Sequence, residues 1–156
     1  MTAHQFGPEI PESRERFWER PFSEGVWDYL DSIEETSRYG IVAGYVHRLV
    51  KGGRVLDAGC GQGHLSAFLD LDRLDYTAFD VSPTAIRRAR EMYADIGFFA
   101  VSLDDFNCPP ESYDMVVFNE VLSTLENPIE TLKRYYGYVR PGGYVLISQF
   151  QNADPA

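Results

Sequence analysis

The sequence predicts an α/β protein with a doubly wound, mainly parallel sheet. From residue 54 onward, short apolar segments typical of strands alternate with segments of helical spacing. Right-handed crossovers between such strands place helices on both faces of one sheet. In addition, 44% of the 156 residues are apolar and 14% are aromatic, which is enough to bury a core and too much for a disordered chain.

The length suits a single domain, residues 1–156. Within it we distinguish an N-terminal helical arm or lid, residues 1–50, from an α/β core, residues 51–156. The first 25 residues are rich in Glu, Arg and Pro and carry scattered aromatic residues. We expect this arm to be ordered only where its aromatic side chains pack on the core: Phe6, Phe17, Trp18 and Phe22.

Residues 26–50 have apolar residues at helical spacing. Gly40 and Gly44 weaken this segment, because glycine is a poor helix former, so either two helices or one kinked helix is expected. The Gly-Gly pair at residues 52–53 ends it.

The remaining elements follow from apolar runs and from the residues that punctuate them. Ser82 and Pro83 supply a helix cap and a first-turn proline. The unbroken apolar run at 113–118 is typical of a strand buried on both faces. We expect strands at 54–57, 76–80, 98–102, 113–118 and 144–149, helices at 64–71, 83 to about 95 and 128 to about 138, a linker at 107–112 and a turn at 141–143.

The charge and the cysteines exclude several classes of protein. A formal net charge of -10 disfavours nucleic acid and anionic membranes as partners. Cys60 and Cys108 form no CxxC or Cys/His cluster, so neither a disulfide scaffold nor a metal site is expected, and a reducing cytoplasm fits best. We find no signal-peptide pattern at the N-terminus and no apolar run long enough to span a membrane.

The strongest local signal is Val-Leu-Asp-Ala-Gly-Cys-Gly-Gln-Gly at residues 55–63, a strand that ends in Gly-x-Gly-x-Gly and opens a helix. Glycines there let a ligand approach the backbone, and the helix N-terminus presents free N–H groups. Such a turn can also serve close packing alone. The second strand ends in Asp80, 23 residues after Asp57, where a carboxylate can accept both hydroxyls of a ribose. The alternative role of Asp80 is to cap the next helix.

Four segments together resemble the class I S-adenosylmethionine-dependent methyltransferases. Residues 55–63 resemble the first motif of that family, Ala-Phe-Asp-Val-Ser-Pro at 78–83 the second, residues 112–125 the fourth, and Val-Arg-Pro-Gly-Gly-Tyr-Val-Leu-Ile at 139–147 the late turn and strand. The four motifs occur in the family's order and cover residues 52–148. A nicotinamide-dependent dehydrogenase is disfavoured, because its fingerprint is GxGxxG and Gly63 breaks that spacing.

The resemblance implies a Rossmann-like sheet of order 3-2-1-4-5 and S-adenosylmethionine as the cofactor. It implies that Asp80 holds the ribose hydroxyls and that Val81 packs on the adenine. Asn119 would lie beside the methyl donor, with its backbone carbonyl available to the cofactor's amino group. The methionine part and the ribose edge would be wrapped by Asp57, Gly59, Gly61 and Gly63.

Arg38 lies near the position at which related enzymes keep an arginine for the cofactor carboxylate. Its alternative role is a surface ion pair with Glu34 or Glu35. The family commonly ends its third strand in Gly-Asp-Ala, which this chain lacks. The adenine contact is therefore expected from one of three neighbours: Ser102, the backbone of Leu103, or Asp104.

Many relatives follow the fourth motif with histidines that can act as a base, but this chain has Ser123-Thr124 there. We interpret His47 and His64 as structural residues. Glu120 is the candidate catalytic residue, since it could orient a cationic amine or accept a proton. Its alternative role is an acidic residue favoured at a helix N-terminus.

The family sheet normally continues with a sixth and a seventh strand, which have no counterpart in this sequence. The fifth strand would then be an exposed apolar edge, which proteins rarely leave bare. Truncation of a longer chain or edge pairing in a homodimer is favoured over coverage by the arm. The arm's aromatic residues, Trp27 included, more plausibly close over cofactor and acceptor as an apolar lid or a cation-binding cage.

The function that these observations favour is methyl transfer to nitrogen or oxygen of a small-molecule acceptor in the cytoplasm. Two alternatives stay open. One is a catalytically silent module that binds S-adenosylmethionine or a partner protein, and the other is a different nucleotide-using α/β enzyme such as a reductase.

Overall fold

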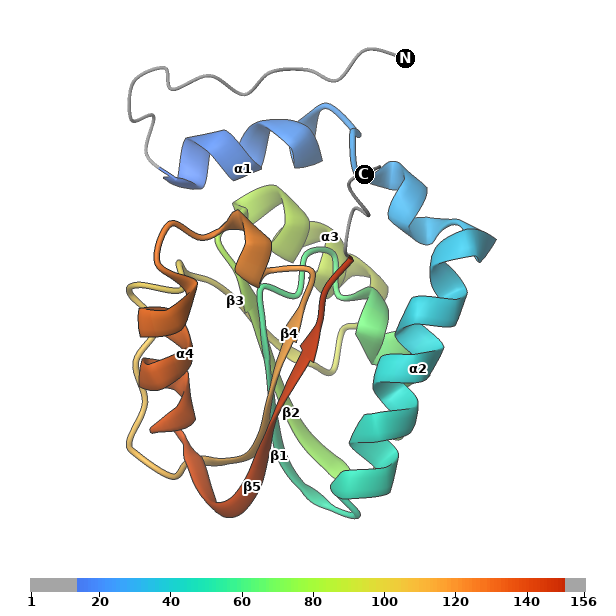
Figure 1. Cartoon of the computed structure of the whole chain (residues 1–156). Coiled ribbons are helices and arrows are strands. Elements are labelled where there is room, and N and C mark those ends of the chain that lie inside the picture. The colour runs from blue at the N-terminus through green and yellow to red at the C-terminus, as the bar shows by residue number, and fades with distance from the viewer. Residues whose placement is uncertain (1–13, 151–156) are drawn as a thin grey trace, which may run out of the picture.

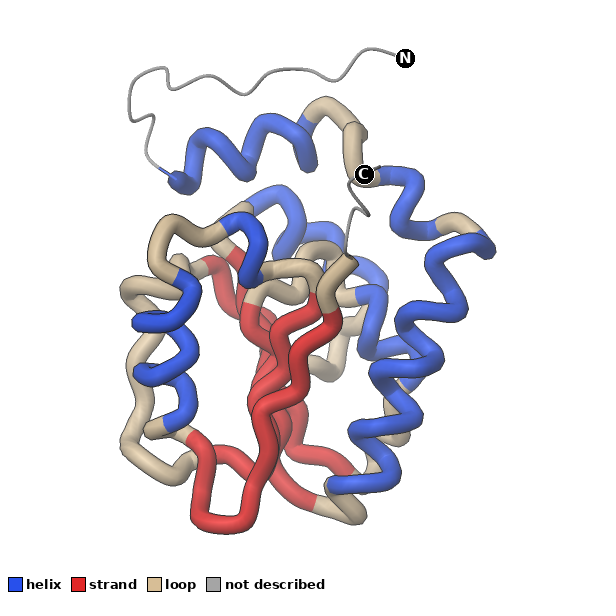
Figure 2. Tube along the Cα trace, in the orientation of Figure 1, coloured by secondary structure: helices blue, strands red, loops and turns tan. Residues whose placement is uncertain are grey.

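The computed structural model describes residues 14–150 and contains one parallel five-stranded sheet of order β3-β2-β1-β4-β5 (Figures 1 and 2). This confirms the predicted fold class and strand order. The five strands are β1 (Gly53–Ala58), β2 (Leu74–Asp80), β3 (Gly97–Ala100), β4 (Tyr113–Asn119) and β5 (Val139–Ser148). Because β1 lies between β2 and β4, the strand order reverses at β1, and the carboxyl ends on either side of that point form a ligand-binding crevice in open α/β sheets.

Alternating residues of the central strands face two separate cores. Val55 of β1 packs with α2 (Ile33–Leu49), α3 (Pro83–Met92) and the short 3-10 helix η2 (His64–Phe68). Leu56 faces the opposite side, where Tyr135 of α4 (Pro128–Tyr136) is fully buried. No helix joins β3 to β4. The loop between them, which includes the expected linker, packs Phe106 against the second core.

The arm lies across the carboxyl ends of the strands (Figure 1). From here on, the arm means the part of residues 1–50 that precedes α2. It comprises α1 (Arg14–Ser23) and the 3-10 helix η1 (Asp28–Asp31), and its first 13 residues, Phe6 among them, lie outside the described part of the chain. Glu19 of α1 accepts hydrogen bonds from the hydroxyls of Ser82 and Thr84 at the start of α3. Arg88 of α3 and Asp28 form an ion pair at 3.0 Å. The arm is therefore attached to α3 at two points.

Residues 26–50 form two helices, which was one of the two expected arrangements. The break between them lies at Ser32 and not at Gly40 or Gly44. Gly40 and Gly44 lie inside a continuous α2, because Tyr39, Val42 and Val46 anchor that helix in the core. The expected helix at 64–71 is wrong in type and length. It is the 3-10 helix η2, which ends where Leu69 turns extended so that the chain can reach β2.

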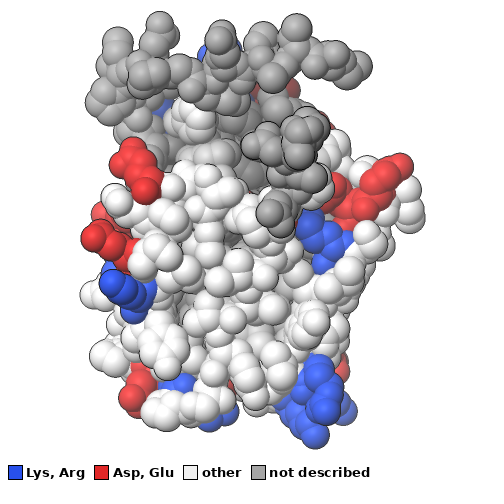
Figure 3. All heavy atoms as spheres, in the orientation of Figure 1, with Lys and Arg blue, Asp and Glu red and all other residues white. Residues whose placement is uncertain are grey.

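The expected turn at 141–143 lies inside β5, where the register of the pairing between β4 and β5 shifts. Val139 pairs with Tyr113, and Tyr144 is already paired with Met115. A Cβ on Gly143 would lie 2.6 Å from the carbonyl oxygen of Asp114, so the close approach requires glycine there. Among the described residues β5 is an edge strand. The face around it carries few charges (Figure 3), and Ile147 is 46% exposed.

Candidate functional site

The glycines of the loop after β1 are of two kinds: two pack against core side chains, and one faces the arm. Gly59, Gly61 and Gly63 all have positive φ. A Cβ on Gly59 would lie 2.6 Å from Val121, and one on Gly63 would lie 2.8 Å from Phe98, so both are required by packing within the core. The nearest neighbour of a Cβ on Gly61 is Phe22 of the arm, at 3.6 Å. Gly61 is thus the member of the loop that a ligand beneath the arm could approach.

Asp80 ends β2 and fastens the glycine loop to it. One carboxylate oxygen accepts the backbone N–H of Gly61 at 2.9 Å, and the other accepts that of Ser82 at 2.9 Å. Burial raises the pKa of Asp80, although its backbone hydrogen bonds oppose this. The helix cap itself is Ser82, whose hydroxyl accepts from Ala85, as the sequence predicted. Asp80 is therefore not the cap of α3, and each of its oxygens keeps a lone pair for a further donor.

Asp57 lies at the centre of the sheet, paired in register with Ala78 of β2 and Val117 of β4. It is 1% exposed, and the hydroxyl of Tyr76 donates to its Oδ2 at 2.6 Å. Burial raises its pKa to about 7, against the opposing effect of the Tyr76 hydrogen bond. Its Oδ1 is buried and has no partner among the described residues.

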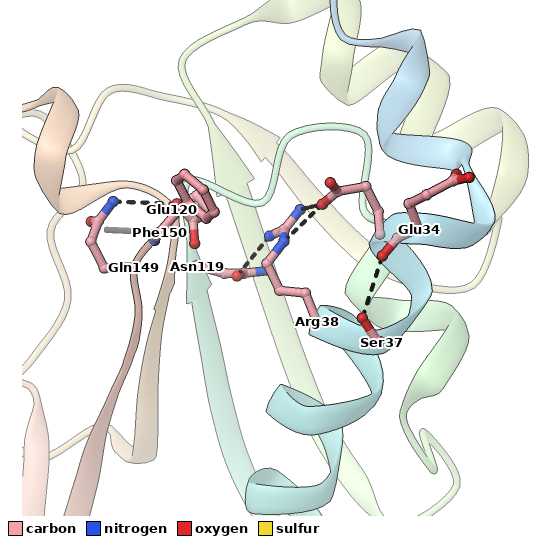
Figure 4. A network of polar contacts seen from close by, with 8 residues as sticks. Glu34, Ser37, Arg38, Asn119, Glu120, Gln149 and Phe150 are labelled. Carbon is pink, nitrogen blue, oxygen red and sulfur yellow. Dashed lines mark hydrogen bonds and ion pairs between the residues drawn. The ribbon is translucent and has the colours of Figure 1, made fainter. Parts of the chain in front are cut away.

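Arg38 of α2 reaches the end of β4 (Figure 4). Its Nη1 donates to Oδ1 of Asn119 at 2.8 Å, and its Nη2 lies 2.6 Å from the Glu35 carboxylate. Arg38 thus makes the ion pair with Glu35 that was one of its two expected roles, and its guanidinium also faces the carboxyl end of β4. The structure brings Arg38 and Asn119 together from positions 81 residues apart.

Glu120 has a left-handed backbone, with φ of 62°, and its carboxylate points toward the chain that leaves β5 (Figure 4). It accepts the backbone N–H of Phe150 at 2.9 Å and the side-chain amide of Gln149 at 3.3 Å. The alternative role at a helix N-terminus is wrong, because the next helix, η3 (Leu122–Thr124), has no acidic residue in its first turn.

The segment after β3 holds the residues expected to contact the adenine. The carbonyl of Leu103 accepts the hydroxyl of Tyr135 at 2.9 Å, and the carbonyl of Asp104 accepts from Arg134 at 2.9 Å, so both face α4. The hydroxyl of Ser102 donates to Asp105 at 2.6 Å. Val81, directly after β2, is half-buried.

Three polar residues have buried atoms that sequence reasoning did not single out: it passed over Gln62, interpreted His64 as structural and treated Trp27 only as a lid aromatic. Gln62 and His64 are almost fully buried, and the Nε2 of each has no hydrogen-bond partner in the described chain. The same holds for Nε1 of Trp27, whose ring the sequence had placed in the lid. The signal for Gln62 and His64 was present, because Gln62 belongs to the glycine motif and His64 directly follows it. His47 accepts the backbone N–H of Asp70 at 3.0 Å, which agrees with its expected structural role.

These observations test whether a polar ligand fits the site. Leaving a buried polar atom without a hydrogen bond costs about 1–3 kcal/mol. Three such atoms belong to residues 57–64, in the glycine loop or directly beside it, and a fourth belongs to the arm: Oδ1 of Asp57, Nε2 of Gln62, Nε2 of His64 and Nε1 of Trp27. Buried donors and acceptors of this kind suit a ligand that carries both acceptors and donors. The residues present therefore fit a cofactor such as S-adenosylmethionine.

Within residues 14–150, no three His, Cys, Asp or Glu side chains are grouped so as to hold a metal ion. None of the helices in that range is both long and apolar enough to cross a membrane.

Fold and site together define a Rossmann-like α/β protein whose candidate site residues lie at the carboxyl edge of β1, β2 and β4. The family model of the methyltransferase domain matches residues 14–156, so the chain belongs to that family. The resemblance to class I S-adenosylmethionine-dependent methyltransferases is thereby confirmed.

Two curated relatives illustrate the similarity. The chain is 31% identical over 110 residues to a ubiquinone biosynthesis O-methyltransferase of Xanthomonas campestris, covering 67% of this chain and 46% of the relative. It is 35% identical over 99 residues to an uncharacterized methyltransferase of Mycobacterium bovis, covering 62% and 50%. The chain thus spans about half the length of the curated relatives it matches.

Solved structures show the same fold at lower identity. The 1,6-didemethyltoxoflavin-N1-methyltransferase of Burkholderia thailandensis superposes with a TM-score of 0.71 at 21% identity, covering 95% of this chain and 69% of that one. A SAM-dependent methyltransferase of Leishmania major gives a TM-score of 0.68 at 21% identity, with 85% and 58% covered.

Proposed function

We propose that this chain transfers the methyl group of S-adenosylmethionine to an oxygen or nitrogen atom of a small-molecule acceptor. The observation that carries the proposal is the hydrogen bond between Asp80 and Gly61, which joins the end of β2 to a glycine loop lined by unpartnered polar atoms. This is the geometry at which doubly wound folds hold a nucleoside, with a carboxylate for the sugar and a glycine for close approach.

Several residues are suited to hold the cofactor. The remaining lone pairs of Asp80 would accept the two ribose hydroxyls. Arg38 would pair with the cofactor carboxylate, and Asn119 would lie close to the amino group. We keep Val81 and the 102–104 segment as the adenine side. When bound, S-adenosylmethionine supplies an activated methyl group on a positively charged sulfur.

The chain's own contribution to the reaction would be alignment. Holding the acceptor in line with the transferred carbon can accelerate transfer greatly without a strong base. Trp18 and Trp27 stack with ring centroids 6.4 Å apart in the arm above the site, which supports a lid that excludes water. Glu120 would orient a cationic acceptor or take its proton, provided that it releases Phe150.

The named relatives support a small-molecule acceptor. One is an O-methyltransferase of ubiquinone biosynthesis, and a structural neighbour is an N1-methyltransferase of 1,6-didemethyltoxoflavin. The two names leave oxygen and nitrogen as equal candidates for the methylated atom.

The direct test is incubation with isotopically labelled S-adenosylmethionine and a panel of phenols, amines and carboxylic acids, followed by detection of labelled product. The proposal expects product with at least one class, and expects Asp80→Ala to abolish it while Asp75→Ala, exposed at the other end of β2, leaves it unchanged. Cofactor binding without any product would favour the silent binding module. Competition by NAD but not by S-adenosylhomocysteine would favour a reductase.

We further propose a cytoplasmic protein without nucleic-acid or membrane partners, on the grounds of its charge of -10 and its two free cysteines. Pairing of β5 edges in a homodimer is supported by the exposure of Tyr144 (41%) and Ile147 (46%) on a face with few charges (Figure 3). Sedimentation equilibrium tests the dimer, and Ile147→Lys should return it to monomer.

A further inference from the structure

His64 is held in one orientation by the arm. It directly follows Gly63 and begins η2, and its side chain is 8% exposed. Its Nδ1 lies 3.1 Å from Oδ1 of Asp31 in η1, and its ring lies 5.7 Å from that of Tyr39 in α2. A carboxylate can only accept, so Nδ1 carries the hydrogen in this pair.

The other ring nitrogen of His64 is an unused acceptor. Burial lowers the pKa of His64, and nearby Arg38 acts in the same direction, while Asp31 opposes them. The balance of these effects favours the neutral imidazole. With the hydrogen on Nδ1, Nε2 presents a lone pair, which is buried and without a partner in the described chain.

A second unused acceptor lies at the start of the same loop. Oδ1 of Asp57, which lies two residues before Gly59, is also buried and without a partner among the described residues. Acceptors on both sides of one loop suit a ligand group that has several hydrogens to donate. An ammonium group has three, and a positive charge that the Asp57 carboxylate would favour.

We propose that Nε2 of His64, with Asp31 as its positioning residue, accepts a hydrogen bond from the amino group at the methionine end of the cofactor. This inference rests on the proposed function, since S-adenosylmethionine and S-adenosylhomocysteine carry that ammonium. It gives the arm a second task beyond covering the site, because Asp31 of the arm selects the tautomer that can bind.

The test is calorimetric binding of S-adenosylhomocysteine and of its deaminated analogue, which lacks only the amino group. We expect His64→Leu to weaken S-adenosylhomocysteine about tenfold or more, and to leave the deaminated analogue nearly unchanged. His64→Gln, which restores an acceptor oxygen near the position of Nε2, should recover part of the loss. The matched control is His47→Leu, which removes a structural histidine and should change neither affinity.

Asp31 is tested by imidazole ¹⁵N NMR of the unaltered chain and of Asp31→Asn. In the unaltered chain we expect the hydrogen on Nδ1, and a shift of the Nε2 resonance when S-adenosylhomocysteine is added. Asp31→Asn should mix the tautomers and weaken S-adenosylhomocysteine in the same selective way. This measurement needs no His64 variant, so it decides the question even if His64→Leu fails to fold.

The inference fails if His64→Leu binds S-adenosylhomocysteine as tightly as the unaltered chain, or if the Nε2 resonance does not move on binding. It also fails if cofactor affinity is unchanged and a limb of the pH–rate profile is lost, since His64 would then act on the acceptor. Absence of S-adenosylhomocysteine binding in the unaltered chain would instead overturn the proposed function.

Discussion

The backbone N–H of Gly61 donates to the carboxylate of Asp80 at 2.9 Å, and this hydrogen bond joins the loop after β1 to the end of β2. The two residues are 19 positions apart; Gly61 follows β1, and Asp80 ends β2, the parallel neighbour of β1. Because the same carboxylate also accepts from Ser82, its position is set by two backbone groups before any ligand arrives. A preorganised acceptor of this kind needs little rearrangement to bind a diol.

The first prediction concerns this pair. Asp80→Ala should weaken S-adenosylhomocysteine at least about 100-fold, because two hydrogen bonds to a charged acceptor are lost. Gly61→Val should also abolish binding, since φ of 56° disfavours a branched side chain and the new atoms would meet Phe22. Calorimetry measures both, with Asp75→Ala as the control. Micromolar binding that survives in both variants would remove the site from this edge of the sheet.

The second prediction concerns Arg38. Its guanidinium donates to Asn119 at 2.8 Å and pairs with Glu35, which leaves further N–H groups for a carboxylate. Arg38→Ala should weaken S-adenosylhomocysteine about 10- to 100-fold and leave its decarboxylated analogue nearly unaffected. Arg48→Ala, at the exposed end of the same helix, is the control. Equal losses for both ligands would show that Arg38 acts only by holding α2 against β4.

The third prediction concerns Asp57. Burial raises its pKa to about 7, so the native state keeps a proton that the unfolded chain releases near its ordinary value of 3.8. Between these values stability therefore falls as pH rises, and the full cost is present above pH 7. Asp57→Asn should raise the Tm by at least about 4 °C at pH 8 and by less at pH 5. It should also weaken S-adenosylhomocysteine, because the unpartnered Oδ1 loses its charge.

Thermal melts of the two proteins between pH 5 and 8 provide this comparison. Asp114→Asn, at the far end of β4, is a control whose pH dependence differs in sign. Burial raises the pKa of Asp114, but its hydrogen bonds to Arg54 and Arg140 outweigh this and hold it low. A stability gain for Asp57→Asn that is the same at every pH would contradict the account.

The fourth prediction concerns the attachment of the arm. Glu19 accepts hydrogen bonds from Thr84 and Ser82. Burial alone would raise the pKa of Glu19, but these hydrogen bonds outweigh burial, so the pKa is lowered. A carboxylate with a lowered pKa stabilises the folded arm when the pH is above the ordinary pKa of 4.5. This stabilisation is lost as the pH falls below about 4.5. Glu19→Ala should therefore speed hydrogen exchange across residues 14–31 at pH 7. Glu24→Ala, exposed on the same arm, should not, and equal exchange in both variants would argue against the attachment.

The strands were predictable because their signals are local. Apolar runs bounded by glycine, proline and aspartate marked the first four strands to within two residues, and the cap at Ser82 followed from its neighbour Pro83. The fifth strand begins at Val139, five residues before its expected start, because the expected turn at 141–143 lies inside it. The segment 64–71 had the spacing of a helix but not its length. The need to return to β2 ended it after Phe68, and no local pattern records that requirement.

The candidate site also has a part that local sequence predicts and a part that it does not. Asp57 and Asp80 stand at fixed places in short motifs, so their position at the sheet edge followed from the strand order alone. The pairing of Arg38 with Asn119, and that of Asp31 with His64, depends on how the arm and α2 pack against the sheet. Likewise, only the packed structure shows that Gly59 and Gly63 face Val121 and Phe98, whereas Gly61 faces the arm.

The most direct test of the central claim is a crystal structure of this chain with S-adenosylhomocysteine. The account predicts the ribose hydroxyls within hydrogen-bond distance of Asp80, the amino-acid end beside Asp57 and Arg38, and the arm closed above. Ligand density away from the end of β2, or none at millimolar ligand, would contradict it.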